Sequence, residues 1–497
     1  MFASYLLNIS LAAIGVVVGI IFGAIPGMTA TMAVAVFLPM TYALDLVPAL
    51  WLLLGLYVGG ISGGLVPAIL INVPGTPSTV CTGFDGNPMA RRGEGERALK
   101  IGITASLMGG MISLAVLAVL TPPLAKVAIK FSAVEKFLII LFAITVIAAL
   151  SKGRMTKGIF AGMLGVMLSL VGELTMNNKM RMVPAFLKSE LRAGFQLLPL
   201  LIGLFAIMQM FQEAEAGMKA NAMDEGASTE SAVKFNFRRD FKGSAVNVIR
   251  SSLLGTFMGI LPGVGGSAAS LIAYSQTKTW SKHPEELGKG APEGLISSES
   301  SNNGLTGGAL VPLLSLGIPG DSTTAVLVGA FLLQGIQVGP LFIQQNPDIW
   351  NQILISLFAC NILMFLIMFF PIKLISKVVN IKSARLYPVI LIMCIVGAYA
   401  TRSGVMFDVW SLLIFGVIGY LMSKIGLPTS PFLIGFILGG DLETYFLEAV
   451  RGNNYSLAPF FTRPIAIVIW VLIVIFLGYS IWDNAKGKTM EKAGMKD

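Results

Sequence analysis

The sequence contains few charged residues, one histidine and few cysteines. Only 12% of its 497 residues are Asp, Glu, Lys or Arg, about half of the roughly 25% typical of soluble globular proteins. Because His283 is the single histidine, a metal site with several histidine ligands is excluded. Cys81, Cys360 and Cys394 lie far apart and form no CxxC motif, which argues against a disulfide framework and a zinc site.

Apolar residues dominate what is present, at 55% of the chain. Stretches of about 20 apolar residues, long enough to cross a hydrocarbon core about 30 Å thick, recur throughout. They predict an all-α polytopic membrane protein, with the first stretch retained because it has no basic region of a signal peptide. We expect spans at residues 5–25, 46–71, 98–120, 133–150, 156–172, 194–211, 245–261, 305–318, 322–343, 351–371, 386–400, 405–423, 430–447 and 464–482.

The net charge is +9. The Lys and Arg residues lie in short clusters between the apolar stretches, which is the positive-inside pattern of cytoplasmic loops. We therefore interpret them as orienting a multi-pass protein in a bacterial inner (cytoplasmic) membrane, with the lipid bilayer and not nucleic acid as its surroundings.

The chain divides into two similar halves. The longest polar segment, 212–244, separates a first membrane repeat at 1–211 from a second at 245–497. The spacing G-x3-G-x2-P-G occurs at 19–27 and again at 255–263. Further on, each half has a proline seven residues before a Pro-Gly pair. These matches predict an internal repeat.

Pro-Gly pairs interrupt the apolar sequence of both halves. Proline costs about 3 kcal/mol or more inside a helix and glycine roughly 1 kcal/mol. In a membrane such breaks are tolerated where the bared backbone is buried in protein or lines a wet cavity. A half-helix N-terminus suits a carboxylate and unwound carbonyls suit Na⁺. We expect re-entrant or discontinuous helices at Pro26 and Gly27, Pro74 and Gly75, Pro262 and Gly263, and Pro319 and Gly320.

The loops after these breaks differ in charge. Basic residues follow the second and third breaks, at 91–100 and 278–289, whereas 41–46 and 339–350 contain no Lys or Arg. Equivalent loops therefore carry opposite bias in the two halves. The simplest interpretation is an inverted-topology repeat, an architecture of secondary transporters.

Hydroxyl side chains follow two of the breaks. Thr76 and Ser78 follow the second, and Ser322 and Thr323 follow the fourth. They can donate to substrate oxygens, or they can only cap their own helices; for the two clusters together we favour substrate binding. Asp321 is the only charged residue between Glu299 and Asp348, so either it binds a coupling cation or proton, or it caps a half-helix beside an aqueous vestibule.

Three amide side chains are further candidates. Asn302 and Asn303 are adjacent, and Asn72 lies just before the second break. An amide offers donors and an acceptor, so it can bridge an anion and a cation, and Asn303 is a candidate for ion coupling. The alternative is that two adjacent amides form a turn.

Motifs of other functional classes are incomplete in this sequence. Ser62 lies in a G-x-S-G string, a pattern used by intramembrane serine proteases. A serine nucleophile needs a base, and the single histidine lies in a polar loop, which argues against a protease. Gly487, Lys488 and Thr489 lack the upstream glycine of a phosphate-binding loop. A stand-alone transporter, channel or facilitator stays open as the main alternative.

Long ordered motifs now point to one family. They include LYVGGISGG at 56–64, INVPGTPST at 71–79, FDGNPMARRGEGERAL at 84–99, GKGAPEG at 288–294 and NNGLTGGALVPLLSLGIPG at 302–320. Over nearly its whole length the chain resembles the large membrane subunit of the tripartite tricarboxylate transporters, the TctA family.

The resemblance implies a transporter without enzymatic activity or cofactor, driven by a Na⁺ or H⁺ gradient. It implies a small membrane partner of about four helices and a periplasmic binding protein that delivers a carboxylate. An elevator-like motion is expected, and dimerisation of the complex would assist it. The implied substrate-binding residues are Asn72, Gly75, Thr76, Ser78, Asn302, Asn303, Gly320, Ser322 and Thr323.

The sequence departs from the family pattern in the second half. Members commonly have PEG-x3-PE-x2-NNA, whereas Ser298 precedes Glu299 here, and Asp321 stands where serine is common. An acidic side chain repels a trianion unless it is neutralised, which argues against citrate and leaves smaller carboxylates or a neutral solute open. Asp85, Glu293 and Glu299 either form a gate or are solvated loop charges, and we favour the second interpretation.

Overall fold

The computed structural model describes residues 2–149, 155–174, 179–215, 233–381, 383–402 and 404–492. Regular structure in these ranges is almost entirely helical, as the apolar pattern predicted. One hairpin is an addition to the all-α expectation. In it, β1 (Gly172–Leu174) pairs antiparallel with β2 (Lys179–Arg181), with Gly172 opposite Arg181.

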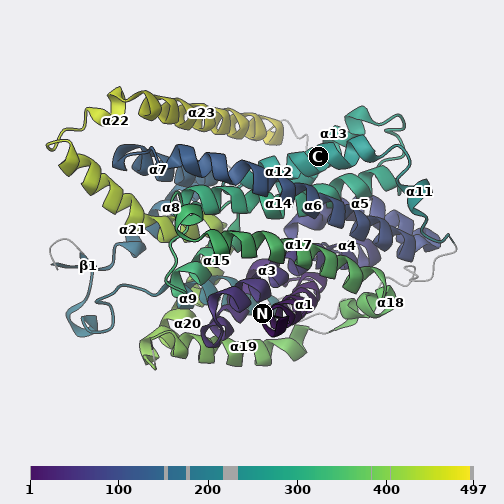
Figure 1. Ribbon diagram of the computed structural model, residues 1–497, viewed down its shortest axis with the longest axis horizontal. Helices are drawn as coiled ribbons and strands as arrows, with labels where there is room; N and C mark the ends of the chain where they lie inside the picture. The colour runs from purple at the N-terminus through teal and green to yellow at the C-terminus, as the bar shows by residue number, and fades with distance from the viewer. Residues whose placement is uncertain are drawn as a thin grey trace.

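Most helices run along the long axis of the molecule (Figure 1). Those of the first half are α1 (Phe2–Ala24), α2 (Ala30–Phe37), α3 (Leu46–Gly63), α4 (Leu65–Ile71), α5 (Val80–Met89), α6 (Gly95–Ala128), α7 (Ala133–Ala149), α8 (Met155–Ser169), α9 (Leu197–Ile202) and α10 (Met208–Glu215). The second half contains α12 (Ala245–Ile260), α13 (Gly265–Trp280), α14 (Pro292–Leu316), α15 (Ser322–Leu333), α16 (Phe342–Gln345), α17 (Pro347–Phe369), α18 (Ile372–Ile375), α19 (Ser383–Ala400), α20 (Met406–Lys424), α21 (Thr429–Gly452), α22 (Pro459–Thr462) and α23 (Pro464–Lys492).

Six apolar helical stretches in the described part of the chain are long enough to cross a membrane by length and composition. They are Ser4–Ala24, Leu46–Ile71, Pro77–Ala128, Leu197–Glu215, Pro347–Phe369 and Met406–Lys424. Several other predicted spans are shorter helices. The span expected at 322–343, for example, ends at Leu333 because Gly335 takes a left-handed conformation, with φ 74°.

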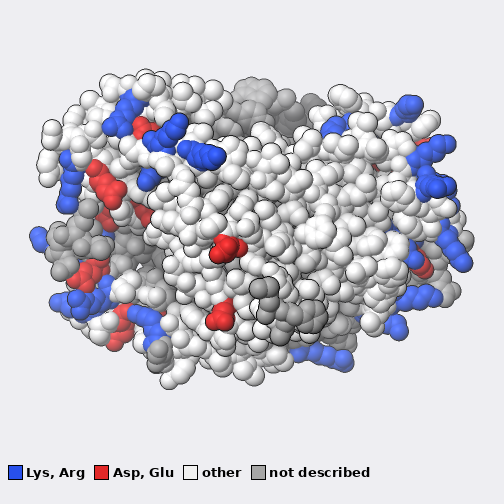
Figure 2. All heavy atoms as spheres, viewed as in Figure 1, with Lys and Arg blue, Asp and Glu red and all other residues white. Residues whose placement is uncertain are grey.

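Charge is distributed as a membrane protein requires. Figure 2 shows the Lys and Arg side chains gathered at the two ends of the long axis, with a broad uncharged band between them apart from isolated acidic side chains. Most helices therefore run in the direction that joins the two charged ends. This arrangement supports a polytopic membrane protein.

The packing of α1 on α3 recurs between α12 and α14. A Cβ on Gly23 would overlap the backbone oxygen of Gly60, and a Cβ on Gly259 would overlap that of Leu305. Both glycines belong to the repeated G-x3-G motif. In each half, the glycines of the motif thus allow the backbones of two helices to come close: α1 and α3 in the first, α12 and α14 in the second.

The chain turns in the same way at the ends of α4 and α14. Asn72 ends α4 with φ 55°, and Gly317 ends α14 with φ 77°. In each case the next N–H bonds back to a proline carbonyl, Val73 to Pro67 at 3.4 Å and Ile318 to Pro312 at 3.2 Å. Asparagine tolerates the left-handed conformation, which gives Asn72 a local structural role.

The basic loops of the two halves lie close together. Arg92 Nη2, in the first of them, donates to the carbonyl of Gly290, directly after the second, at 2.9 Å. Near the loops without Lys or Arg, Gln334 Nε2 at the end of α15 donates to the Thr41 carbonyl at 3.2 Å. Segments of the first and second halves therefore meet at both places.

Helix α14 is the centre of the fold and is longer than the sequence suggested. Only residues 305–318 were predicted as apolar helix, whereas α14 begins at Pro292. All residues from Gly294 to Ser315 are buried. The polar string before residue 305 resembles a loop in composition, but tertiary packing against α6, α12 and α13 places it inside.

The structure describes part of the predicted linker at 212–244. Residues 216–232 lie outside the described residues, and α11 (Phe237–Asp240) follows them. Asp240 anchors this helix to α6, with its Oδ1 2.9 Å from Arg97 Nη2 and 2.7 Å from Arg239 Nε. Burial raises the pKa of Asp240, but hydrogen bonds from Arg239, Arg97 and the Asn236 backbone outweigh it and lower the pKa from 3.8 to about 2.

The stability that Asp240 contributes should depend on pH. Because the folded-state pKa is depressed, the stabilisation is fully present above about pH 4 and is lost as the pH falls toward about 2. We expect Asp240→Asn to destabilise the protein by about 1–2 kcal/mol at neutral pH, less than the full pKa shift would give because Arg239 is half exposed. Urea unfolding of both proteins at pH 6 and near pH 3 measures this. If the difference in unfolding free energy between wild type and variant does not shrink at the lower pH, the ionised Asp240 is not the source of the stabilisation.

Candidate functional site

One cavity lies where the chain restarts after all four Pro-Gly pairs. Each pair separates two helices: α1 from α2, α4 from the short 3-10 helix η2 (Pro77–Thr79), α12 from α13, and α14 from α15. The residues just after each break line a common cavity of about 380 Å³, which residues of α10 and α21 also line. This volume is within the range of roughly 300–1,000 Å³ typical of small-molecule sites.

Three helices, α2, η2 and α15, begin at the cavity, and each begins with an N-cap side chain. Thr29 caps α2 by accepting from the Met32 N–H at 3.1 Å. Thr76 caps η2 in a reciprocal capping box with Thr79, and Asp321 caps α15 in the same way with Thr324. Free N–H groups and the positive end of the helix dipole favour a negatively charged ligand at such a place.

Asp321 both caps α15 and lines the cavity. Its Oδ1 accepts from the Thr324 N–H at 2.7 Å, and its Oδ2 accepts from the Tyr57 hydroxyl of α3 at 3.0 Å. No Lys or Arg is among the described residues that line the cavity, and Asp321 carries its one formal charge. A bound anion would therefore meet an uncompensated carboxylate.

The segments that restart the helices after the four breaks are called the tips. Hydroxyl pairs join the tips to one another and to α21. Thr31 and Thr323 lie 2.8 Å apart between their Oγ1 atoms, which connects the first break to the fourth. Ser322 and Ser430 lie 2.8 Å apart between their Oγ atoms. Because a hydroxyl can donate or accept, these pairs can reorient toward a ligand without moving the backbone.

The structure brings together only part of the predicted set. Thr76, Ser78, Asp321, Ser322 and Thr323 line the cavity, together with Gly263 of the third break. Gly75 and Gly320 lie behind the tips, where a Cβ would overlap the backbone oxygens of Gly23 and Gly259 respectively. These two glycines are close-packing positions on which the tips are built.

The predicted amides lie outside the cavity lining. Asn72 is exposed at the end of α4. Asn302 and Asn303 are fully buried within α14, so the alternative of a turn is wrong. Asn303 Oδ1 accepts from the Ser62 hydroxyl at 2.7 Å, and Asn302 Nδ2 donates weakly to the Ile61 carbonyl at 3.4 Å.

Several cavity residues were missed in the sequence. Thr29, Thr31 and Ser267 follow the first and third breaks, and the rule applied to the other two breaks would have found them. Gln209 of α10 and Ser430 of α21 carry no such signal, because neither lies near a Pro-Gly pair in the chain.

Two of the acidic residues interpreted as solvated loop charges are buried, which corrects that interpretation. Asp85 Oδ1 accepts from the backbone N–H groups of Gly288, Gly290 and Ala291, each at 2.8 Å, and so holds the loop before α14. Glu299 lies inside α14 with no exposed surface. Burial here comes from tertiary packing, which the polar local sequence does not reveal.

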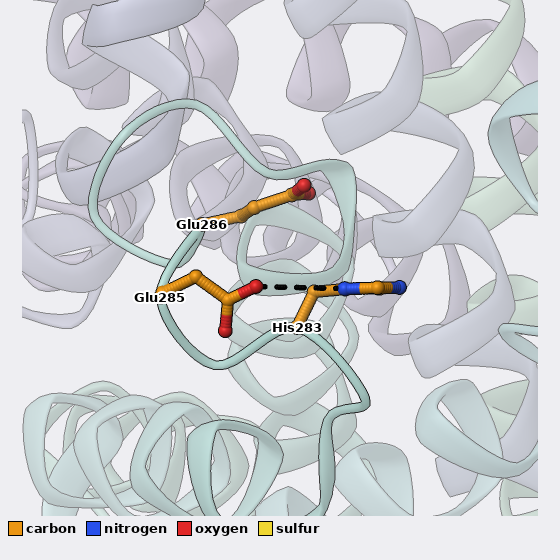
Figure 3. Close-up of side chains that lie close together, drawn as sticks. All are labelled: His283, Glu285 and Glu286. Carbon is orange, nitrogen blue, oxygen red and sulfur yellow. Dashed lines mark ion pairs between the residues drawn. The ribbon is translucent and has the colours of Figure 1, made fainter.

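The remaining candidates for other chemistry lie apart from one another. Ser62 is bonded to the Asn303 amide and not to a base. Figure 3 shows His283, Glu285 and Glu286 on one loop between α13 and α14, with Glu285 Oε1 3.5 Å from His283 Nδ1. All three are exposed, and exposed acidic groups of this kind are common without a metal.

Comparisons with known proteins agree with the motifs and the fold. Residues 9–434 match the model of the Tripartite tricarboxylate transporter TctA family. An uncharacterized 52.8 kDa protein in the TAR-I ttuC' 3' region of Agrobacterium vitis is 35% identical over 464 residues, which cover 92% of this chain and 90% of that protein. An uncharacterized protein in the TAR-II ttuC' 3' region of the same organism is 37% identical over 212 residues, 43% of this chain and 87% of that protein. No solved structure matches the chain. The chain is thus a multi-pass membrane protein and belongs to the TctA family of tripartite tricarboxylate transporters.

Proposed function

We propose that this chain is the translocating subunit of an ion-gradient-driven importer of small organic anions, with the cavity at the four helix breaks as its substrate site. The observation that carries the proposal is the meeting of N-caps and hydroxyls from both halves on one cavity of about 380 Å³. A carboxylate there would accept from backbone N–H groups and from the hydroxyls of Thr76, Ser78, Ser322 and Thr323.

Ion coupling is supported by the charge of the cavity. An anion beside Asp321 is repelled by several kcal/mol at short range, and the lining offers no Lys or Arg to offset this. A Na⁺ ion or a proton at Asp321 removes the repulsion. Substrate and cation then bind together, which is the thermodynamic basis of symport. Asn303 lies outside the lining, so a role in ion binding would act through the α3–α14 contact.

Alternating access by an elevator-like motion is supported by the internal repetition. The glycine contacts and the left-handed helix ends recur in both halves, as expected of inverted repeats that hold half-helix tips near the membrane midplane. Asp321 occupies the place in its half that Thr76 occupies in the other. The two tips are therefore related in structure and differ in charge.

The proposed partners follow from the tripartite family. We propose a periplasmic binding protein that delivers the carboxylate, a small membrane subunit of about four helices, and a location in the bacterial inner membrane. Dimerisation of the complex would hold a scaffold still while a transport domain moves.

The test is uptake into proteoliposomes that contain the chain with its small subunit. The binding protein is added with bound carboxylate, and a Na⁺ or a proton gradient is imposed. We expect accumulation that needs both the gradient and the binding protein. Flux without a gradient would indicate a channel or facilitator, and uptake indifferent to the binding protein would indicate a stand-alone transporter.

A further inference from the structure

A carboxyl group without a cationic partner lies in the middle of the fold. Glu299 is on the central helix α14 and has no exposed surface. Its Oε1 accepts from the Thr82 hydroxyl of α5, and its Oε2 accepts from the Ser106 hydroxyl of α6 at 2.8 Å. Asn302 follows Glu299 by one turn of α14, so the two side chains are neighbours on this helix.

The charged groups on the helices packed around α14 are engaged elsewhere. On α5, Asp85 binds the loop before α14 and the Tyr274 hydroxyl of α13. On α6, Arg97 pairs with Asp240. On α12, Arg250 Nη2 donates to Thr277 of α13 at 3.0 Å.

The other ionic groups near these helices are also accounted for. Lys100 of α6 pairs with Glu96 at 2.6 Å. On α14 itself, Glu293 accepts from the Ser281 hydroxyl at 2.7 Å at the start of the helix. The remaining charged residue of α13, Lys278, belongs to the basic loop end. Among the described residues, the Glu299 carboxyl is thus left with hydroxyl partners.

A proton fits this environment better than a metal cation does. An isolated buried carboxylate costs several kcal/mol unless it is neutralised. Sodium would need several oxygen ligands around an open space, but hydroxyls already contact both Glu299 oxygens, and Glu299 does not line the cavity. A proton adds no volume, and the hydroxyls can reverse their hydrogen bonds to accommodate it.

Asn302 connects Glu299 to the substrate cavity. Its Oδ1 is buried and has no hydrogen-bond partner among the described residues. A Cβ on Gly266, which lines the cavity, would lie 3.6 Å from this oxygen and would overlap Cβ of Ser78. A ligand at Ser78 is therefore separated from the Glu299 carboxyl by Gly266 and one amide side chain.

We propose that Glu299 is a proton-binding site that couples proton movement to substrate movement, in addition to the cation or proton expected at Asp321. This inference rests on the proposed function and names the ion for a second carboxyl. The carboxylate takes up one proton from the side to which the cavity is open, forming the neutral acid. It releases that proton after the cavity opens to the other side, so one proton crosses per cycle.

A spectroscopic experiment tests the site without any assay of transport. Infrared spectra of the purified full chain in lipid are recorded across pH, where the C=O stretch of a protonated carboxyl is absent from ionised carboxylates. We expect a band that titrates with pH in the wild type, is missing in Glu299→Gln, and persists in Glu293→Gln, a matched control on the same helix. Asp321→Asn identifies the contribution of the carboxyl that lines the cavity. Identical spectra for wild type and Glu299→Gln at every pH would overturn the inference.

Transport separates proton coupling from a structural role. Each coupled proton allows about tenfold accumulation of substrate per pH unit. We expect Glu299→Gln to lose this accumulation and to retain exchange of labelled for unlabelled substrate, because exchange needs no net proton movement. Accumulation equal to that of the wild type would overturn the inference. Should Glu299→Gln fold poorly, Glu299→Asp retains the carboxyl and is expected to keep the infrared band. If the wild type transports nothing under any gradient, the proposed function fails while the spectra still decide the role of Glu299.

Discussion

Asp321→Asn is expected to make carboxylate binding independent of the cation at this site and to abolish the part of uphill transport that this cation drives. At about 5 Å and an effective dielectric constant of about 20, a carboxylate repels a bound anion by roughly 3 kcal/mol. Without cation, the variant should therefore bind substrate on the order of 100-fold more tightly than the wild type. Adding cation should then improve its affinity little, and its gradient-driven accumulation should fall to what the proton at Glu299 supports.

The fold should survive this change. Asn is as good an N-cap as Asp, and its amide oxygen can accept from the Thr324 N–H that Asp321 Oδ1 binds now. We expect the unfolding free energy to change by about 1 kcal/mol, because the Tyr57 hydroxyl must then accept from the new amide instead of donating to Oδ2. Titration calorimetry with substrate, with and without Na⁺ and at two pH values, measures the effect. Asp348→Asn is the matched control, because Asp348 is exposed in the first turn of α17. Cation-dependent binding that persists in Asp321→Asn would show that the coupling cation binds elsewhere.

Alanine at Gly75 or Gly320 is expected to disrupt the substrate site and much of the fold. A Cβ at either position would overlap a backbone oxygen, that of Gly23 or Gly259, and backbone cannot move aside as a flexible side chain can. Overpacking of this kind typically costs about 1–3 kcal/mol per site, and here it also displaces a helix N-terminus. We expect each single variant to lose most uptake and the double variant to fail to accumulate as a monodisperse protein.

Gly440→Ala provides the control for this pair. Gly440 lies in α21 with no heavy atom within 4 Å of an added Cβ. Alanine has the higher helix propensity by about 1 kcal/mol, so this variant should be as stable as the wild type or more stable. Size-exclusion profiles and thermal unfolding in detergent compare the variants. A Gly320→Ala protein with wild-type stability and uptake would refute the close-packing role.

Much of the helical pattern could be read from the chain because hydrophobic stretches and Pro-Gly pairs act locally. The breaks at Pro74 and Pro319 separate helices in the structure where the sequence placed them. The extent of α14 could not be read, because its polar half, including Glu299 and Asn302, has the composition of a loop. Such residues become helical core when neighbouring helices satisfy them, and that depends on contacts far apart in sequence.

Part of the candidate site could likewise be predicted from the sequence, and part could not. The hydroxyls after the second and fourth breaks were visible as N-cap types, since capping is decided within a few residues. Ser430 and Gln209 come from segments more than 100 residues away from the tip at Asp321 and join the cavity only through packing.

The sequence by itself determined that the protein is helical and membrane-embedded, where its helices break, and to which family it belongs, because these depend on local composition and ordered motifs. The tertiary structure alone decided that the four breaks share one cavity, that Asn72 lies outside it, and that Glu299 is buried without a cation. Those outcomes depend on which helices pack together, and no local pattern specifies that.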